Sequence, residues 1–185
     1  MNMGFDAIIG IDPGKSGGIA VCSPGSLTKT VKMPKDIIDL CEYMKYLQGI
    51  HKTPIAFMEK VQMFHQDSEG ERGGSSYGKQ FGIGKLLEQS KEIKNALKIV
   101  GIPYILVHPM TWQSYLHLRK QGENDKVQRK NRYKDAAQNM FQDIKVTLWN
   151  SDALLLAKFG LTRIERDPEW ILENLPAQIS KTFKF

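Results

Sequence analysis

The chain has 185 residues and a mass of 21.0 kDa, so one domain with a substantial buried core is expected. No apolar run approaches the roughly eighteen residues of a transmembrane helix, and two cysteines are too few for a disulfide framework. Because the N-terminus also lacks a signal-peptide pattern, we expect a cytoplasmic protein. Lys and Arg outnumber Asp and Glu by 26 to 20, and the net charge of +6 favours a polyanionic partner.

The first third of the chain predicts a three-stranded meander followed by a crossover. Short apolar runs at 7–11 and 19–21 and an alternating stretch at 27–33 predict three antiparallel strands. Apolar residues spaced at three and four over 35–48 predict an amphipathic helix. A buried run at 55–59 follows that helix, and a strand–helix–strand unit places this strand parallel to an earlier one.

The rest of the chain predicts mainly helices. Residues 62–82 are rich in Gly and predict a long loop, of a length that is usually functional or disordered. The predicted elements that follow are a helix at 83–100, a strand at 104–107, a short helix at 111–116, a helix whose apolar spacing covers 133–141 and whose first turns carry a basic run, and a capped helix at 152–159. The apolar residues in the tail after 167 indicate that part of it packs against the core.

Two of the predicted strands end in an acid. Asp12 ends the first strand, before a Pro-Gly turn, and Glu59 ends the strand after the crossover. If these strands are parallel neighbours, both carboxylates leave the same edge of the sheet about 4.8 Å apart. Like charges at that spacing repel unless a cation neutralises them, and Mg²⁺ is bound preferentially by carboxylates. The alternative is two solvent-facing acids, paired with Lys15 or Lys60.

Asp152 is the natural third ligand of such a metal site. It lies in the first turn of an apolar helix, where the helix dipole favours an acid whether or not it has a chemical role. Three carboxylates suit two magnesium ions a little under 4 Å apart, which would activate a water and stabilise the leaving 3′ oxygen of a phosphodiester. The pattern therefore predicts phosphodiester hydrolysis without a general-base histidine.

Five basic residues and no acidic one lie between positions 126 and 134. They are Lys126, Arg129, Lys130, Arg132 and Lys134. Contact between these side chains and a phosphate backbone would give salt-sensitive affinity that does not depend on sequence. The alternative is a solvated helix face.

Three motifs in this order resemble those of the RuvC family of Holliday junction resolvases, and more narrowly its small phage-type or prophage-type members. The motifs are Ile-Gly-Ile-Asp-Pro-Gly, Phe-Met-Glu-Lys-Val and Ser-Asp-Ala-Leu-Leu-Leu-Ala. The likeness spans about 6–160, which leaves 161–185 as a C-terminal extension of a single RuvC-like nuclease domain, 1–185. It implies an α/β fold of the ribonuclease-H type, with a five-stranded mixed sheet of order 3-2-1-4-5 and helices on both faces.

The resemblance also implies an activity. The expected protein is a homodimer in a bacterial or phage-infected cell that binds four-way DNA and makes paired nicks during recombination and repair. Its catalytic acids and metal ligands would be Asp12, Glu59 and Asp152, and its cofactor Mg²⁺ or Mn²⁺, two per active site.

The chain departs from the family pattern at one ligand. The family's usual fourth ligand stands three residues before the last Asp, where this chain has Trp149, and Asn150 is the neighbouring oxygen donor that could serve as a metal ligand. The family also places a DNA-stacking aromatic after the second acid, and Phe64 is the candidate here. Lys130 falls where the family has a basic residue near the scissile phosphate, and Lys15 is a further candidate for contact with nucleic acid.

Two other functions stay open at this point. A branched-DNA-binding protein with weak or lost cleavage is favoured by the missing fourth ligand, and a nuclease of the same fold could instead act on RNA. The Asp-x-Gly-x-x-x-Gly pattern also resembles the phosphate loop of actin-like ATPases and sugar kinases. Those proteins need two such domains, for which this chain is too short.

Overall fold

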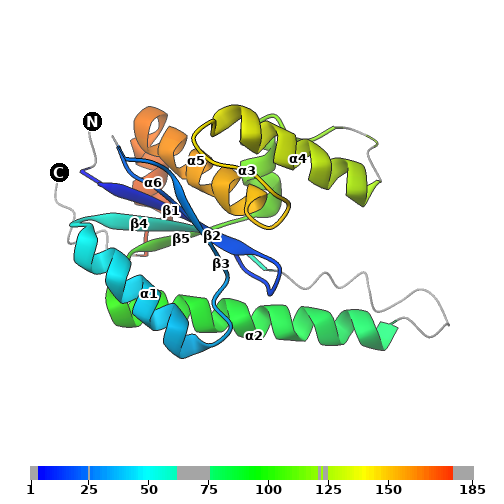
Figure 1. The fold of residues 1–185 in the computed structure, drawn as a ribbon, viewed down its shortest axis with the longest axis horizontal. Helices are drawn as coiled ribbons and strands as arrows, with labels where there is room; N and C mark the ends of the chain where they lie inside the picture. Colours follow the sequence, from blue (N-terminus) through cyan, green and yellow to red (C-terminus); the bar gives the residue numbers. More distant parts are fainter. Residues whose placement is uncertain (1–3, 25, 62–75, 121, 123–124, 177–185) are drawn as a thin grey trace.

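A five-stranded mixed sheet of order β3-β2-β1-β4-β5 lies at the centre of the computed structural model (Figure 1). The structure describes residues 4–24, 26–61, 76–120, 122 and 125–176, and for 76–81 only the course of the helix. The strands are β1 (Ala7–Asp12), β2 (Gly18–Cys22), β3 (Lys29–Lys32), β4 (Pro54–Glu59) and β5 (Tyr104–Val107). Strand β2 is antiparallel to β1 and β3, whereas β4 is parallel to both β1 and β5. The predicted strand order is confirmed.

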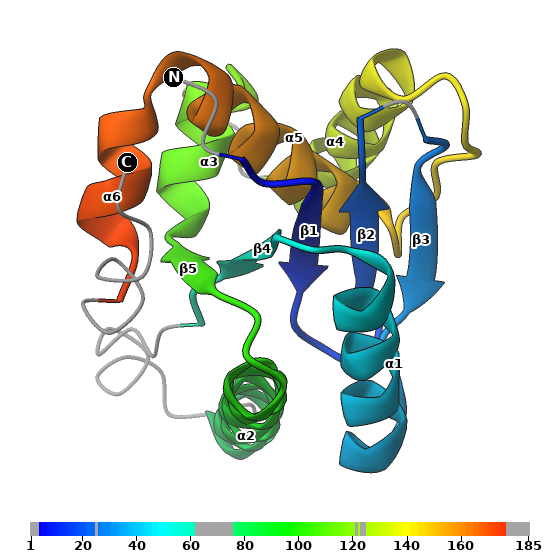
Figure 2. The ribbon, with the colours of Figure 1, turned by 90° about the vertical axis from the view of Figure 1, so that its left-hand side faces the viewer.

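Helices cover both faces of the sheet, as predicted (Figure 2). Helices α1 (Ile37–Ile50) and α2 (Ser76–Val100) lie on one face, and α3 (Pro109–Tyr115), α4 (Lys126–Met140), α5 (Ser151–Arg166) and α6 (Pro168–Asn174) lie on the other. Each face buries its own apolar core, because successive strand residues point to opposite sides. No helix in the described part of the chain is both long and apolar enough to cross a membrane.

Helix α5 packs directly on the backbone of β1. A Cβ atom added at Gly10 would lie 2.0 Å from the carbonyl oxygen of Ala153 and 2.5 Å from the amide nitrogen of Ala157. Further along the helix, a Cβ at Gly160 would lie 2.3 Å from the ring of Phe57 in β4. Glycine is therefore required at Gly10 for the contact of α5 with β1 and at Gly160 for its contact with β4. Together these contacts hold the start of α5 above the carboxyl end of β1.

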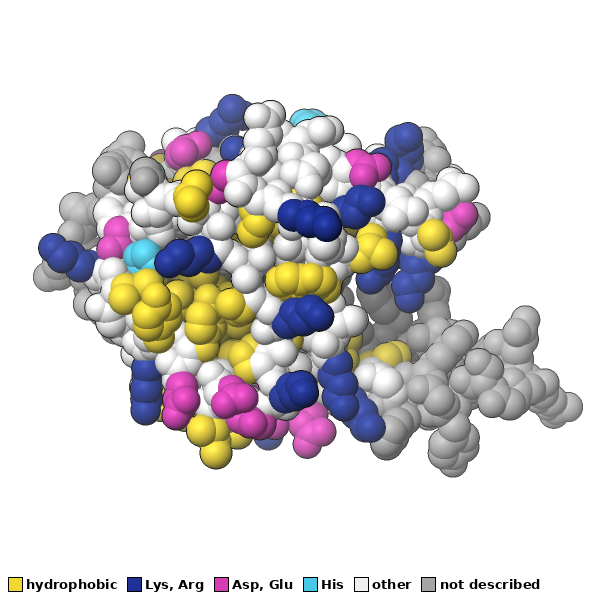
Figure 3. Space-filling model, viewed as in Figure 1, with side chains coloured by type: hydrophobic (Ala, Val, Ile, Leu, Met, Phe, Trp, Pro, Cys, Tyr) yellow, Lys and Arg dark blue, Asp and Glu magenta, His cyan; other side chains and the backbone are white. Residues whose placement is uncertain are grey.

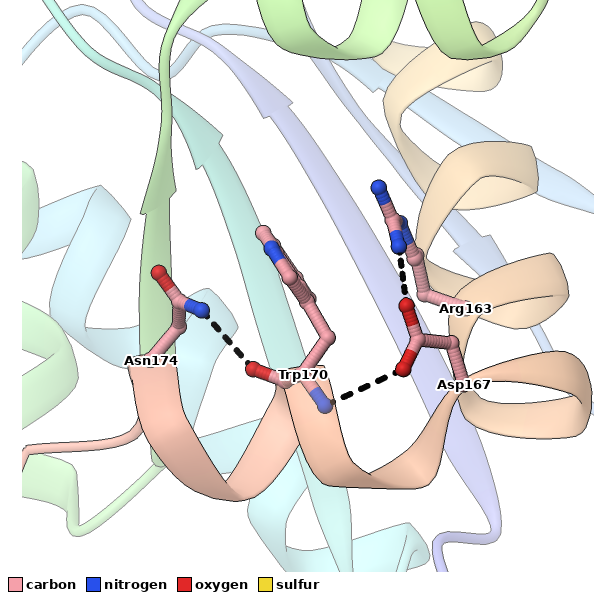
Figure 4. A network of polar contacts seen from close by, with 4 residues as sticks. All are labelled: Arg163, Asp167, Trp170 and Asn174. Carbon is pink, nitrogen blue, oxygen red and sulfur yellow. Dashed lines mark hydrogen bonds and ion pairs between the residues drawn. The ribbon is translucent and has the colours of Figure 1, made fainter.

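The junction between α5 and α6 is held by a polar and aromatic cluster (Figure 4). Arg163 forms an ion pair with Asp167, whose carboxylate also accepts a hydrogen bond from the backbone N–H of Trp170 at 3.3 Å. The Arg163 guanidinium lies 4.8 Å from the centroid of the Trp170 ring and 4.2 Å from that of Tyr115. Asn174 closes the next turn by donating to the carbonyl of Trp170 at 2.8 Å. This cluster fixes α6 against the core, so the prediction that part of the tail packs is confirmed.

Two helix boundaries differ from the prediction by more than about two residues, which is the usual scatter of helix ends. Helix α2 begins at Ser76 rather than at 83, because the glycines that indicated a loop reduce helix propensity without abolishing it. Helix α5 continues to Arg166, beyond the apolar stretch that predicted an end at 159.

Candidate active site

Asp12 and Glu59 lie at the carboxyl ends of adjacent parallel strands. The β1–β4 register pairs Ile11 with Met58, so the two acids occupy the next step along the same strands. Ile11 and Met58 are buried in the core beneath α1 and α2. The side chains one residue further on therefore point to the other face of the sheet, toward α5.

The turn after Asp12 holds this acid closely. Gly14 has a φ of 137°, and its carbonyl accepts a hydrogen bond from the N–H of Gly17 at 2.9 Å. A Cβ at Gly17 would lie 2.2 Å from the carbonyl oxygen of Asp12. A side chain at either glycine would be strained or would clash, so the turn keeps the acid at the strand end.

Asp152 reaches the same region from helix α5. It lies in the first turn of the helix, next to Ser151, whose hydroxyl donates to its carboxylate at 3.2 Å. Because Ala153 contacts Gly10 directly, the residue before it lies close to the end of β1.

The three acids lie close enough to influence one another electrostatically. Burial raises the pKa of Asp12 well above its ordinary range, and the charges of Asp152 and Glu59 raise it further. Burial, followed by the charge of Asp152, raises the pKa of Glu59 to about 7. Burial also raises the pKa of Asp152. The ionised forms of these three acids are therefore poorly solvated by water and repel one another. A bound cation would stabilise them.

Two cations of helix α4 partly neutralise the acids. The positive charge of Lys130 opposes the pKa rise of all three carboxyl groups, and Arg129 opposes that of Asp152.

The remaining predicted DNA-binding residues of this helix have other surroundings. Arg132 donates to the carbonyl of Leu118 at 2.6 Å, Lys134 forms an ion pair with Asp135 at 3.7 Å, and Lys126 is exposed. The basic run therefore divides into a part that faces the acids and a part that does not.

Trp112 is a site residue that sequence reasoning missed. Its indole Nε1–H donates a hydrogen bond to Oε2 of Glu59 at 3.0 Å, from a side chain that is fully buried in α3. Its ring also meets Tyr133 of α4 edge to face, at 5.7 Å between centroids. Trp112 thus links the Glu59 carboxylate to the helix that carries Lys130. No local motif indicates this contact, because the two residues are 53 positions apart.

The donor set of the site fits a hard divalent cation. Asp12, Glu59 and Asp152 offer only carboxylate oxygens, which are the ligands that Mg²⁺ and Mn²⁺ prefer. As the side chains stand, no group of three His, Cys, Asp or Glu residues in the described chain is arranged to hold a metal ion. The carboxylates of the three acids would have to turn toward one another for such an ion to bind.

The side chain of Asn150 is fully used in local hydrogen bonds. Its side-chain oxygen accepts hydrogen bonds from the N–H and the hydroxyl of Thr147, at 2.7 and 3.1 Å. Its side-chain nitrogen donates to Thr30 and to the carbonyl of Lys145. Both acceptor positions of the oxygen are therefore used, and we do not retain Asn150 as a metal ligand.

Two further predicted DNA contacts are Phe64 and Lys15. Phe64 lies outside the described residues. Lys15 is exposed and lines a groove of about 960 Å³ between the turn after β1, the start of α1 and helix α2. This groove also contains the acids Asp36, Glu88 and Glu92. Acidic and basic side chains both lie along the lower edge of the face shown in Figure 3. The groove therefore lacks the single sign of charge expected of a phosphate-binding surface.

Comparisons with known proteins identify the fold. No family model matches the chain, and no curated protein matches it. The T. thermophilus RuvC in complex with a Holliday junction substrate is similar with a TM-score of 0.53 at 15% sequence identity, over 87% of this chain and 96% of that one. A Thermus thermophilus RuvC structure gives a TM-score of 0.51 at 14% identity, over 91% and 98% of the two chains. The chain therefore has the ribonuclease-H-like fold found in RuvC Holliday junction resolvases.

Proposed function

We propose that this protein is a divalent-metal-dependent endonuclease that cuts four-way or other branched DNA. The observation that carries the proposal is the placement of Asp12 and Glu59 at the ends of adjacent parallel strands, with Asp152 in the first turn of the helix that packs on β1. The charge of Lys130 on α4 acts on all three acids. The likeness in fold to a RuvC bound to a Holliday junction supports branched DNA as the substrate.

Each residue of the site has a role in this proposal. The three carboxylates would hold Mg²⁺ or Mn²⁺, ions that activate a water and stabilise the leaving oxygen of a phosphodiester. Lys130 and Arg129 would contact the phosphate, to which their charge brings the DNA backbone. The N–H of Trp112 orients the Glu59 carboxylate and favours its charged form.

The direct test compares three substrates. Labelled four-way junction, linear duplex and RNA–DNA hybrid are each incubated with the protein in Mg²⁺ or in EDTA. Symmetric nicks in the junction alone, only with Mg²⁺, are the expected result. Cleavage of the hybrid alone would replace the proposal with a nuclease that acts on RNA.

A second candidate is a protein that binds branched DNA with weak or lost cleavage. Two observations favour it: the three acids are not already arranged around a metal position, and the oxygen of Asn150 is fully engaged with Thr147. Junction binding without nicks in Mg²⁺ or Mn²⁺ would support this candidate.

Paired nicks require two active sites, so we also propose a homodimer. Sedimentation of the free protein and of its junction complex tests this part. A single copy on each junction would contradict it.

A further inference from the structure

A row of three residues crosses the sheet next to the acids. Asp12 of β1 is paired with Gly18 of β2, and Gly18 is paired with Lys32 of β3. Residues paired across neighbouring strands point to the same face. Asp12 and Lys32 therefore share the α5 face of the sheet, two strand spacings or about 10 Å apart, and the strand residue between them, Gly18, has no side chain.

Trp149 fills the space above Gly18. A Cβ atom at Gly18 would lie 2.9 Å from both Cε3 and Cζ3 of the Trp149 ring, so only glycine permits this contact. Lys32 Nζ lies 6.0 Å from the centroid of the same ring, at the limit of a cation–π contact. The indole thus lies between the first acid of the site and a surface lysine.

Packing alone does not account for this indole. Trp149 belongs to neither of the two hydrophobic cores and stays partly exposed, whereas Trp112 is fully buried. Lys32 is exposed, and so is Leu148, the residue before Trp149. A partly exposed aromatic ring beside a cation is the combination that binds nucleic acid by stacking a base and neutralising a phosphate.

The geometry points to a nucleotide-binding subsite formed by Trp149 and Lys32: a base next to the reactive phosphate stacks on the indole, and Lys32 contacts the adjoining phosphate. This inference rests on the proposed function, since it assumes that the reactive phosphate lies at the acids. It gives position 149 a role in substrate binding, where the related resolvases are expected to have a metal ligand.

The test uses a four-way junction with 2-aminopurine placed in turn at the positions flanking the cleavage point, in EDTA so that no cleavage occurs. The wild-type protein should quench the fluorescence at one of these positions. Trp149→Phe should keep the quenching, because an aromatic face remains. Trp149→Leu covers Gly18 with apolar volume but has no π face, so it should lose the quenching and bind the junction at least about fivefold more weakly.

A matched pair of variants tests the lysine. Lys32→Ala should reduce the dependence of log affinity on log salt by about one ion. Lys29→Ala removes the same charge from the same strand, but Lys29 is paired with Val21 and so points to the opposite face. This control should leave both the quenching and the salt dependence unchanged.

Thermal melting of each variant confirms that it is folded. Quenching and affinity like those of the wild type in Trp149→Leu would show that the indole only packs, and would overturn the inference while leaving the nuclease proposal intact. A wild-type protein that does not bind four-way DNA would overturn both.

Discussion

Replacing Glu59 with Gln tests whether the acids are held together at an energetic cost when no metal is bound. The pKa of Glu59 is raised from an ordinary 4.5 to about 7. The folded state therefore keeps a proton that the unfolded state releases, and stability is lost as pH rises through this interval. At about 1.4 kcal/mol for each pH unit, the loss attributable to Glu59 is about 3 kcal/mol between pH 4.5 and 7.

The raised pKa values of Asp12 and Asp152 act in the same direction. We therefore expect the free energy of unfolding of the metal-free wild type to fall by at least about 3 kcal/mol from pH 5 to pH 8. Glu59→Gln has the same shape but cannot ionise, and it also removes a charge that raises the pKa of Asp12. Its stability should fall by about 3 kcal/mol less over the same range.

Urea unfolding in EDTA at pH 5, 6, 7 and 8, followed by fluorescence and extrapolated to water, measures these differences. Glu42→Gln removes one negative charge from the exposed surface of α1 and controls for net charge. Parallel curves for Glu59→Gln and the wild type would refute the reasoning, because they would mean that Glu59 is solvated like a surface acid.

Four further changes test the site and its support. Asp12→Asn should abolish cleavage of a four-way junction while binding in a gel-shift assay is retained, and normal cutting would remove Asp12 from the mechanism. Trp112→Phe deletes the donor 3.0 Å from Glu59, so the pKa of Glu59 should rise further and the cleavage–pH profile should move to higher pH; an unmoved profile would leave Trp112 with packing alone. Lys130→Ala should weaken junction binding and lower its salt dependence by about one ion, whereas a loss of affinity equal at all salt concentrations would contradict phosphate contact. Gly10→Ala places a Cβ 2.0 Å from the Ala153 carbonyl and should destabilise the fold by about 3 kcal/mol or more in urea unfolding, while Gly49→Ala, in an open position of α1, should be neutral or slightly stabilising.

The first two acids could be placed from the sequence because their signals are local. A short apolar run that ends in an acid predicts a strand end, and the crossover predicts that the strand of Glu59 is parallel to an earlier strand, which could be that of Asp12. The β1–β4 register bears this out. The strand order came from the resemblance to a family, because pairing between distant strands leaves no local pattern.

What could not be predicted depends on contacts between distant residues. The hydrogen bond from Trp112 to Glu59 joins α3 to β4, and neither sequence segment contains a sign of the other. The same limit applies to the basic run of α4. Composition shows five cations, but only the fold shows that Lys130 and Arg129 face the acids while Arg132 reaches the carbonyl of Leu118.

The contact between α5 and β1 has a consequence for how this protein can change. Asp152 is joined by one peptide bond to Ala153, whose carbonyl rests against the bare backbone at Gly10. A larger side chain at Ala153 or Ala157 would push α5 away from β1. Asp152 would then move away from Asp12 and Glu59. Substitutions in the buried contact between α5 and β1 would thus alter the distances between the acids even where all three acids are retained. Side chains of increasing size at Ala153 and Ala157 offer a way to vary these distances on purpose.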